Sequence, residues 1–123
     1  MSGGVKIHPL SVVDPSAKLG ADVTVGPFCT VGPNVEVGDR SVLISHVSLD
    51  GRTKIGEEAK IFPFASIGHI PQDLKYHGEE SVLEIGSHCL IREGVTMNPG
   101  TEGGGLVTRV GHHSTFLAKD RKS

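Results

Sequence analysis

Four polar side chains with different chemistry stand close together near the middle of this 123-residue chain. Gln72 offers an amide, Asp73 a carboxylate and Lys75 an ammonium group, and they are followed by Tyr76, the only tyrosine. An amide and a carboxylate can hydrogen-bond sugar hydroxyls, and an ammonium group can pair with a phosphate. The segment therefore suits a ligand that carries both groups, although the same residues also suit an ordinary solvated loop.

A six-residue repeat surrounds this segment and must position it. Stepping by six from Ile7 to Ile67 gives eleven positions, and each is Ile, Leu or Val. The next residue is often glycine, or aspartate at Asp14 and Asp50, and these residue types favour turns and tolerate positive φ. Four positions after each aliphatic residue stands a small residue, such as Cys29. Apolar spacing of three and four, which a helix needs, does not occur.

This pattern predicts an all-β protein, a triangular parallel β-helix. Each hexad forms one short strand and a corner, and three hexads form one coil. Successive coils then stack at about 4.8 Å, the distance between neighbouring strands. We expect a single partial β-helix domain over residues 1–123 with about five coils.

The repeat is interrupted twice. Continuing the aliphatic column after Ile67 would place Asp73 and Glu79 in the core, which is unfavourable for unpaired charges. The pattern resumes at Ile85, stops again near a glycine-rich stretch and returns at Val110. We therefore predict projecting loops at about 69–84 and 100–108. The expected repeats are 7–72, 85–102 and 110–116, followed by a non-repeat tail at 118–123.

Composition and charge exclude several classes of protein. The formal net charge is −2, so the electrostatic signature of sequence-independent nucleic-acid binding is absent. No apolar run approaches the roughly 20 residues that span a bilayer, and the first residues lack a secretory pattern. The two cysteines, Cys29 and Cys89, form no CxxC pair and occupy the small inward column, so we expect reduced thiols that fill the core. These features predict a cytoplasmic protein without a membrane span.

Several short motifs carry a family resemblance that covers about residues 5 to 116. The QDLKY segment at 72–76 follows FASIG at 64–68, and IREGVT, NPGT and GGGL follow at 91–96, 98–101 and 103–106. Together they resemble the hexapeptide-repeat acyltransferases, in particular the UDP-N-acetylglucosamine O-acyltransferases that begin lipid A synthesis in bacteria.

This resemblance implies a left-handed β-helix and a homotrimer with active sites between neighbouring subunits. It implies acyl transfer from acyl carrier protein to the 3-hydroxyl of UDP-N-acetylglucosamine, without a cofactor. On the matching positions, Gln72 and Asp73 would contact or orient the sugar, and Lys75 would lie near the acyl donor or its phosphate.

The match also predicts what these 123 residues lack. The histidine that acts as general base in the family would fall just beyond Ser123, and the repeat pattern is lost after Phe116. His112 and His113 are expected at a solvent-facing turn, about two hexads too early for that role. No catalytic residue is therefore assigned, and we expect the chain alone to be inactive, weakly stable and prone to associate.

Other functions stay open at this point. One alternative is a non-catalytic β-helix fragment that trimerises, and another is a different nucleotide-sugar acyltransferase of the same architecture. Related repeat proteins that bind zinc use two histidines five residues apart, a spacing that none of the seven histidines has, so no metal site is predicted. Gly103–Gly105 lacks the Lys-Ser/Thr of a phosphate-binding P-loop.

Overall fold

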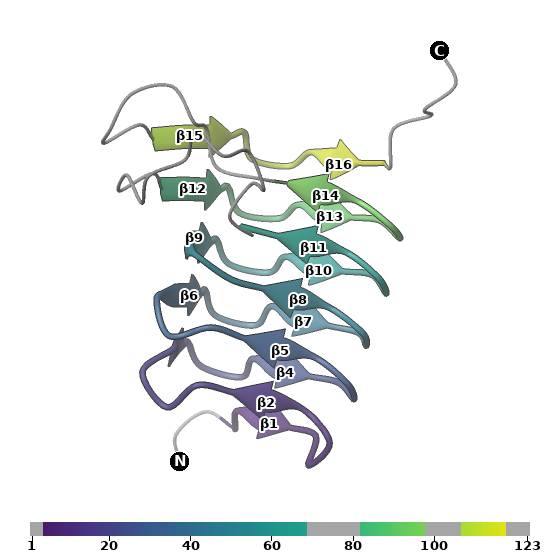
Figure 1. Cartoon of the computed structure of the whole chain (residues 1–123). Coiled ribbons are helices and arrows are strands. Elements are labelled where there is room, and N and C mark those ends of the chain that lie inside the picture. Colours follow the sequence, from purple (N-terminus) through teal and green to yellow (C-terminus); the bar gives the residue numbers. More distant parts are fainter. Residues whose placement is uncertain (1–3, 69–81, 98–106, 118–123) are drawn as a thin grey trace, which may run out of the picture.

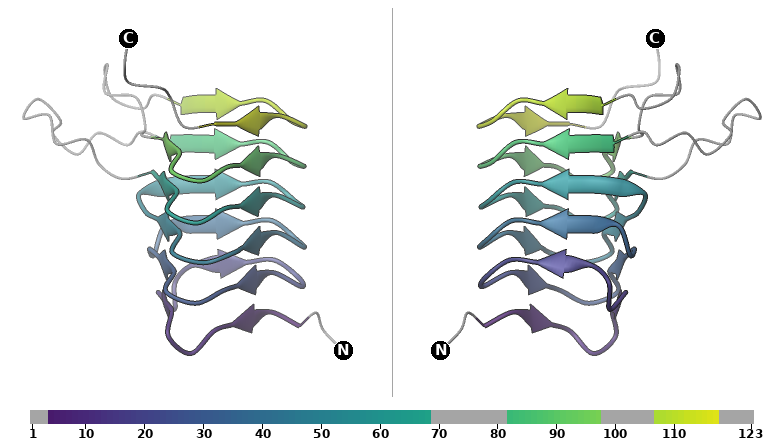
Figure 2. Two further views of the ribbon diagram at one scale, coloured as in Figure 1. Left: turned by 90° about the vertical axis from the view of Figure 1, so that its right-hand side faces the viewer. Right: turned by 90° about the vertical axis from the view of Figure 1, so that its left-hand side faces the viewer.

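The chain forms a three-sided stack of short parallel strands (Figure 1). The structure is a computed structural model that describes residues 4–68, 82–97 and 107–117. Sixteen strands lie in these ranges, and they belong to three sheets that form the three faces. Two side views show the coils lying one above another from the N-terminal to the C-terminal end (Figure 2).

Each face takes every third strand of the chain. The first sheet contains β1 (Lys6–Ile7), β4 (Thr24–Val25), β7 (Val42–Leu43), β10 (Lys60–Ile61), β13 (Leu90–Ile91) and β16 (Thr115–Phe116). The second contains β2 (Val12–Val13), β5 (Thr30–Val31), β8 (Ser48–Leu49), β11 (Ser66–Ile67) and β14 (Thr96–Met97). The third contains β3 (Lys18–Leu19), β6 (Val35–Val37), β9 (Arg52–Ile55), β12 (Val82–Ile85) and β15 (Val107–Val110).

The strand register confirms the expected coil of three hexads. Thr24 pairs with Val42 in the first sheet and Thr30 pairs with Ser48 in the second, an offset of three hexads in each case. Backbone hydrogen bonds join the coils, as from the N–H of Thr24 to the carbonyl of Ser41 (3.0 Å). A fully parallel stack of this kind satisfies the backbone of every inner coil through its two neighbours.

Both repeat columns point inward and fill the interior. From Val23 to Val95 the aliphatic column and the small column are buried in all the coils that the structure describes. In the first coil Ile7 is still 44% exposed, because β1 pairs with β4 alone. The narrow interior explains the shortage of aromatic residues, since facing side chains of Val, Leu and Ile already occupy the space between the three sheets.

The corners differ from the expectation in one respect. Residues with positive φ stand mostly at the third position after the aliphatic residue, and most of them are not glycine, as at Phe28 (φ 60°) and His46 (φ 50°). Of the glycines directly after an aliphatic residue, only Gly68 has positive φ among the described residues. A Cβ at Gly26 would overlap the carbonyl oxygen of Ile44 in the next coil, so this column is glycine because the coils approach closely.

Both predicted loops end too late, and their predicted starts lie outside the described residues. Residues 82–84 were assigned to the first loop, yet they form strand β12, in which Val82 pairs with Arg52 and Leu83 is buried. Residues 107–108 likewise belong to β15 rather than to the second loop. The hexad pattern missed both because these strands have four residues, whereas most strands have two, and they extend backward from the aliphatic position.

Buried polar groups in the small column also join the coils. The hydroxyl of Ser41 donates a hydrogen bond to the carbonyl of Gly56 (2.9 Å) and accepts one from the N–H of Ala59 (3.1 Å). Cys29 and Cys89 are buried free thiols, which confirms their expected place in the core. Burial raises the pKa of the Cys29 thiol, because the thiolate is poorly solvated there.

Gly26→Ala tests whether close approach of the coils explains the glycine column. The added methyl group meets backbone of the next coil, so we expect a loss of about 1–3 kcal/mol of unfolding free energy in urea. Gly111→Ala is the matched control, because the nearest atom to a Cβ there is the Ser114 hydroxyl oxygen at 3.8 Å. Equal losses in both variants would contradict this explanation.

Ser41→Ala tests the buried hydroxyl. The substitution leaves the Ala59 N–H without its acceptor inside the core, and we expect a cost of about 1–3 kcal/mol. Ser16→Ala changes an exposed serine and is expected to stay within about 0.5 kcal/mol of the wild type. Urea unfolding followed by circular dichroism measures both, and a neutral Ser41→Ala would refute the assigned role.

Candidate functional site

The two interruptions of the repeat are attached at the same corner of the stack. Segment 69–81 joins β11 to β12 and segment 98–106 joins β14 to β15, so both run from the second sheet to the third. Their flanking strands are neighbours: Ile67 pairs with Met97 and Val82 pairs with Val107 (Figure 1). The sequence predicted the two segments separately, and the structure places their ends side by side in successive coils.

Gln72, Asp73 and Lys75, the predicted substrate-binding residues, lie in segment 69–81, outside the described residues. The described backbone fixes where this segment starts. Gly68 follows β11 and donates a hydrogen bond from its N–H to the carbonyl of Met97 (2.6 Å). The segment with the predicted binding residues therefore begins after β11, which pairs with β14, the strand that precedes segment 98–106.

The predicted position of the general base, just beyond Ser123, follows the tail at 118–123. Ser123 and the rest of this tail lie outside the described residues. Phe116, the last member of the aliphatic column, is described and ends β16. The assignment of the base to a position after Ser123, with no catalytic residue among the 123, therefore stays a prediction.

The corner one coil below is packed tightly against Gly68, the last described residue before segment 69–81. Gly51 and Gly68 both have positive φ, 63° and 82°. A Cβ at Gly68 would overlap the Asp50 carbonyl oxygen and the Thr53 hydroxyl oxygen, and one at Gly51 would overlap the carbonyl oxygen of Gly68. Thr53 is fully buried and donates a hydrogen bond to that Asp50 carbonyl (2.8 Å).

Sequence reasoning missed the role of this corner. It placed Thr53 in the small column and Asp50 at a turn, but it did not link them to Gly68. The signal that was available is Gly51, which stands one position later than the other corner glycines. A glycine out of register points to a backbone conformation that other residues adopt with strain.

A cleft of about 340 Å³ lies on the third sheet beside this corner, with Asn34, Arg52 and Val82 among its lining residues. Arg52 is exposed and is the register partner of Val82, where segment 69–81 returns to the stack. A guanidinium group binds phosphate with two parallel hydrogen bonds. The cleft thus places the guanidinium group of Arg52 close to Val82, the first described residue after segment 69–81.

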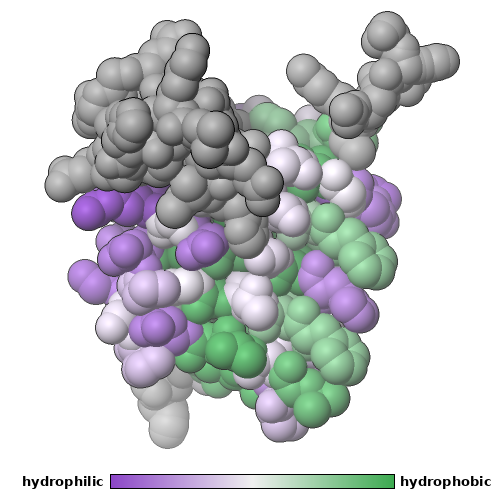
Figure 3. Space-filling model, in the orientation of Figure 1, coloured by the Kyte–Doolittle hydropathy of each residue, from purple (hydrophilic) through white to green (hydrophobic). Residues whose placement is uncertain are grey.

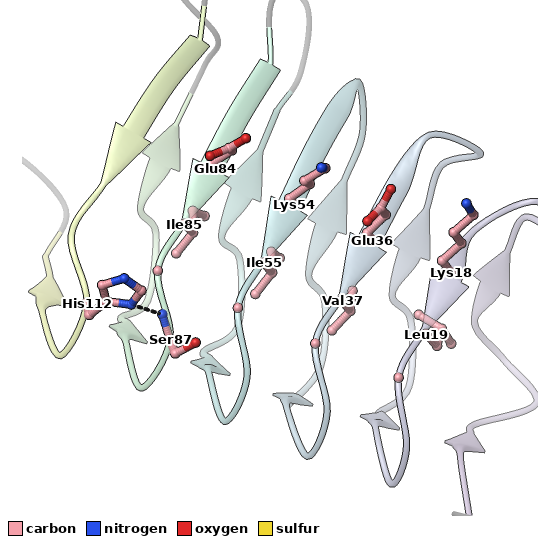
Figure 4. Close-up of a pocket in the computed structure, with 14 residues that line it drawn as sticks. Lys18, Leu19, Glu36, Val37, Lys54, Ile55, Glu84, Ile85, Ser87 and His112 are labelled. Atoms are coloured by element: carbon pink, nitrogen blue, oxygen red, sulfur yellow. Dashed lines mark hydrogen bonds between the residues drawn. The ribbon is translucent and has the colours of Figure 1, made fainter.

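Three described histidines lie at a different corner, between the third and first sheets. His112 Nδ1 accepts a hydrogen bond from the N–H of Ser87 (2.8 Å), so its neutral ring carries the proton on Nε2 (Figure 4). His88 and His113 stack with parallel rings 4.8 Å apart. His112 and His113 are exposed, as expected, and they are away from the corner where both segments are attached.

The remaining two described histidines contact near neighbours in the chain. His8 Nδ1 accepts a hydrogen bond from the N–H of Leu10 (3.1 Å), and His46 Nδ1 lies 3.2 Å from the Ser45 hydroxyl. Within the described ranges, no three His, Cys, Asp or Glu side chains are arranged to hold a metal ion. The same part of the chain contains no helix long and apolar enough to cross a membrane.

Comparison with known proteins finds relatives of this chain. The family described as "Bacterial transferase hexapeptide (six repeats)" matches residues 16–51. An acyl-[acyl-carrier-protein]–UDP-N-acetylglucosamine O-acyltransferase from Rickettsia bellii is 50% identical over 111 residues, 90% of this chain. Over most of its length the chain is thus similar to hexapeptide-repeat acyltransferases.

Solved structures of UDP-N-acetylglucosamine acyltransferases agree with the fold. A UDP-N-acetylglucosamine acyltransferase from Bacteroides fragilis matches 91% of this chain with a TM-score of 0.83 and 44% identity. LpxA from Acinetobacter baumannii matches 89% with a TM-score of 0.83 and 46% identity. The all-β, left-handed parallel β-helix expected from the resemblance is therefore confirmed.

The chain spans about 40% of the length of the curated relatives it matches. For the two solved structures, the covered share is 44% and 42% of the neighbour's chain.

Gly68→Ala tests the corner that fixes the start of segment 69–81. The methyl group would collide with the Asp50 carbonyl and the Thr53 hydroxyl at an unfavourable φ, so we expect a loss of about 1–3 kcal/mol. Gly4→Ala, where a Cβ meets nothing within 4 Å, is expected to be neutral. Urea unfolding measures both, and a Gly68→Ala variant as stable as Gly4→Ala would contradict the packing described.

Proposed function

We propose that this chain forms part of a bacterial cytoplasmic enzyme that transfers a fatty acyl group from acyl carrier protein to the 3-hydroxyl of UDP-N-acetylglucosamine. The observation that carries the proposal is 50% identity over 90% of the chain to a relative named for those two substrates. The shared attachment corner of segments 69–81 and 98–106 supports it, because both carry motifs of the family resemblance.

Three residues are proposed to bind substrate. Gln72 and Asp73 would hydrogen-bond and orient the sugar, since an amide and a carboxylate together accept and donate to hydroxyl groups. Lys75 would lie near the acyl donor and pair with its phosphate. Their sequence positions support this, because all three follow closely after Gly68, whose backbone is held by the corner below.

A homotrimer is proposed as the working assembly. One described corner supports self-association, because it carries exposed apolar and aromatic side chains in a vertical row. The rings of Phe28, His46 and Phe64 lie 5.0 Å apart from one to the next, and the two phenylalanines are 53% and 67% exposed. Leu10 continues the row, and Figure 3 shows apolar surface on this side. Contiguous exposed apolar surface is typical of protein interfaces.

Substitutions in the QDLKY segment test the proposed function. Calorimetric titration of the chain with UDP-N-acetylglucosamine is expected to show binding that Asp73→Asn weakens about tenfold or more, which is the effect of about 1.4 kcal/mol. Titration with the acyl-carrier-protein substrate is expected to show binding that Lys75→Ala weakens to the same extent. Lys60→Ala is the matched control, because Lys60 is exposed on β10 in the first sheet and should leave affinity unchanged.

Two further measurements complete this test. Mass spectrometry of mixtures with acyl-carrier-protein substrate detects any acylated sugar nucleotide, and sedimentation gives the assembly state. Absence of nucleotide-sugar binding by the folded wild-type chain, or equal effects of Lys75→Ala and Lys60→Ala, would overturn the proposal.

A further inference from the structure

The outward-facing side chains of the third sheet form a column of alternating charge. Lys18 of β3 pairs in register with Glu36 of β6, Glu36 with Lys54 of β9, and Lys54 with Glu84 of β12. The column therefore follows the order plus, minus, plus, minus over four coils that lie about 4.8 Å apart. Figure 4 shows these four side chains in one row on the same side of the strands. By register Arg109 of β15 comes next in the ladder.

The corresponding positions on the other two faces carry no such alternation. In the first sheet they are Lys6, Thr24, Val42, Lys60, Leu90 and Thr115, and in the second they are Val12, Thr30, Ser48, Ser66 and Thr96. The charge pattern is thus a property of one face among the described strands and not of the repeat itself.

The first three members of the column do not neutralise one another. No ion pair joins Lys18 to Glu36 or Glu36 to Lys54 in the described structure, although they are neighbours in the ladder. The exposed cation Arg40 behaves differently at the adjoining corner, where it contacts Glu58 at 2.9 Å and Glu57 at 3.4 Å. Lys18, Glu36 and Lys54 thus retain their capacity to pair with charges on another molecule.

The order of these charges is self-complementary under one symmetry. We propose that this face binds the same face of a second copy of the chain, with the two stacks antiparallel. A twofold axis that lies in the plane between the two faces and runs parallel to the strands, at the level midway between Glu36 and Lys54, brings each Glu36 opposite the other copy's Lys54. The same axis brings each Lys18 opposite the other copy's Glu84. A twofold axis parallel to the stack would instead oppose identical charges, which is unfavourable.

The surface beside the column leaves room for the partner's side chains. A groove of about 650 Å³ runs along the face, lined by the four charged residues and by glycines that add no side chain to its floor. The four coils of the column are centred between Glu36 and Lys54, where the proposed axis lies. Lysine stems can lie along such a surface while their ammonium groups reach a carboxylate.

The strength of this association follows from its chemistry. Exposed ion pairs contribute about 0–1 kcal/mol each, so several acting together give weak binding with a defined orientation. Because salt screens such pairs, the association should weaken by about tenfold or more between about 20 mM and 500 mM NaCl.

Charge reversal with mixing tests the proposal directly. Glu36→Lys and Lys54→Glu are each expected to abolish the association, because like charges then oppose one another across the axis. A one-to-one mixture of the two variants restores it, since one chain then carries lysine at both positions and the other carries glutamate at both. Sedimentation equilibrium at both salt concentrations measures the weight-average mass of each sample.

A second set of variants separates pairing between copies from repulsion within the ladder. The double variant E36K/K54E places like charges next to each other in one chain but keeps every pair across the axis complementary, so it should associate as the wild type does. Lys60→Glu makes the same charge change on another face and should leave the wild-type mass unchanged. Circular dichroism confirms that each variant is folded.

The proposal is overturned if the mixture is no heavier than its components, or if the wild-type mass does not depend on salt. Loss of association by Lys60→Glu would also overturn it. None of these readouts uses a nucleotide sugar, so failure here is distinguishable from failure of the proposed acyltransferase function.

Discussion

The backbone hydrogen bonds between coils impose the constraint on which the other features depend. A parallel stack keeps these bonds only if each residue lies directly above its counterpart in the coil before, and here the two are three hexads apart in the chain. The aliphatic column, the small column and the corner glycines all follow from this alignment. A glycine at position 26 is needed because the carbonyl of Ile44 lies against it in the next coil.

The same constraint decides where extra chain can be added. Segments 69–81 and 98–106 lengthen the connection from Arg52 to Val82 and from Val82 to Val107 beyond three hexads, yet the register is restored after each. Both additions stand at corners, where the strands on either side keep their partners. The binding chemistry proposed for the QDLKY segment is thus carried by chain outside the repeat and attached to a regular scaffold.

Much of this architecture could be predicted from the sequence because the period is short and the columns are chemically distinct. The inward positions of Val25, Leu43 and Ile61 follow from counting by six, and their burial agrees. The starts of β12 and β15 could not be found in this way, because residues 82–84 and 107–108 pair by backbone bonds that hexad counting does not detect.

Backbone conformation and contacts between corners were harder to predict. The positive φ of Phe28 and His46 could not be predicted, because glycine is the residue type that favours this conformation and neither position is glycine. At the candidate site, the sequence indicated which residues are proposed to bind substrate. The shared corner and the close approach of Gly68 to Thr53 became evident only from the three-dimensional structure.

The stacking of Phe28, His46 and Phe64 along one corner shows that each coil meets only the coil above and the coil below. Contacts of this kind make the chain modular along its axis. A duplication or loss of three hexads within the regular part would preserve all three faces, whereas a change of any other length must be absorbed at a corner. Evolution can therefore alter the length of such a protein in whole coils, without redesigning its interior.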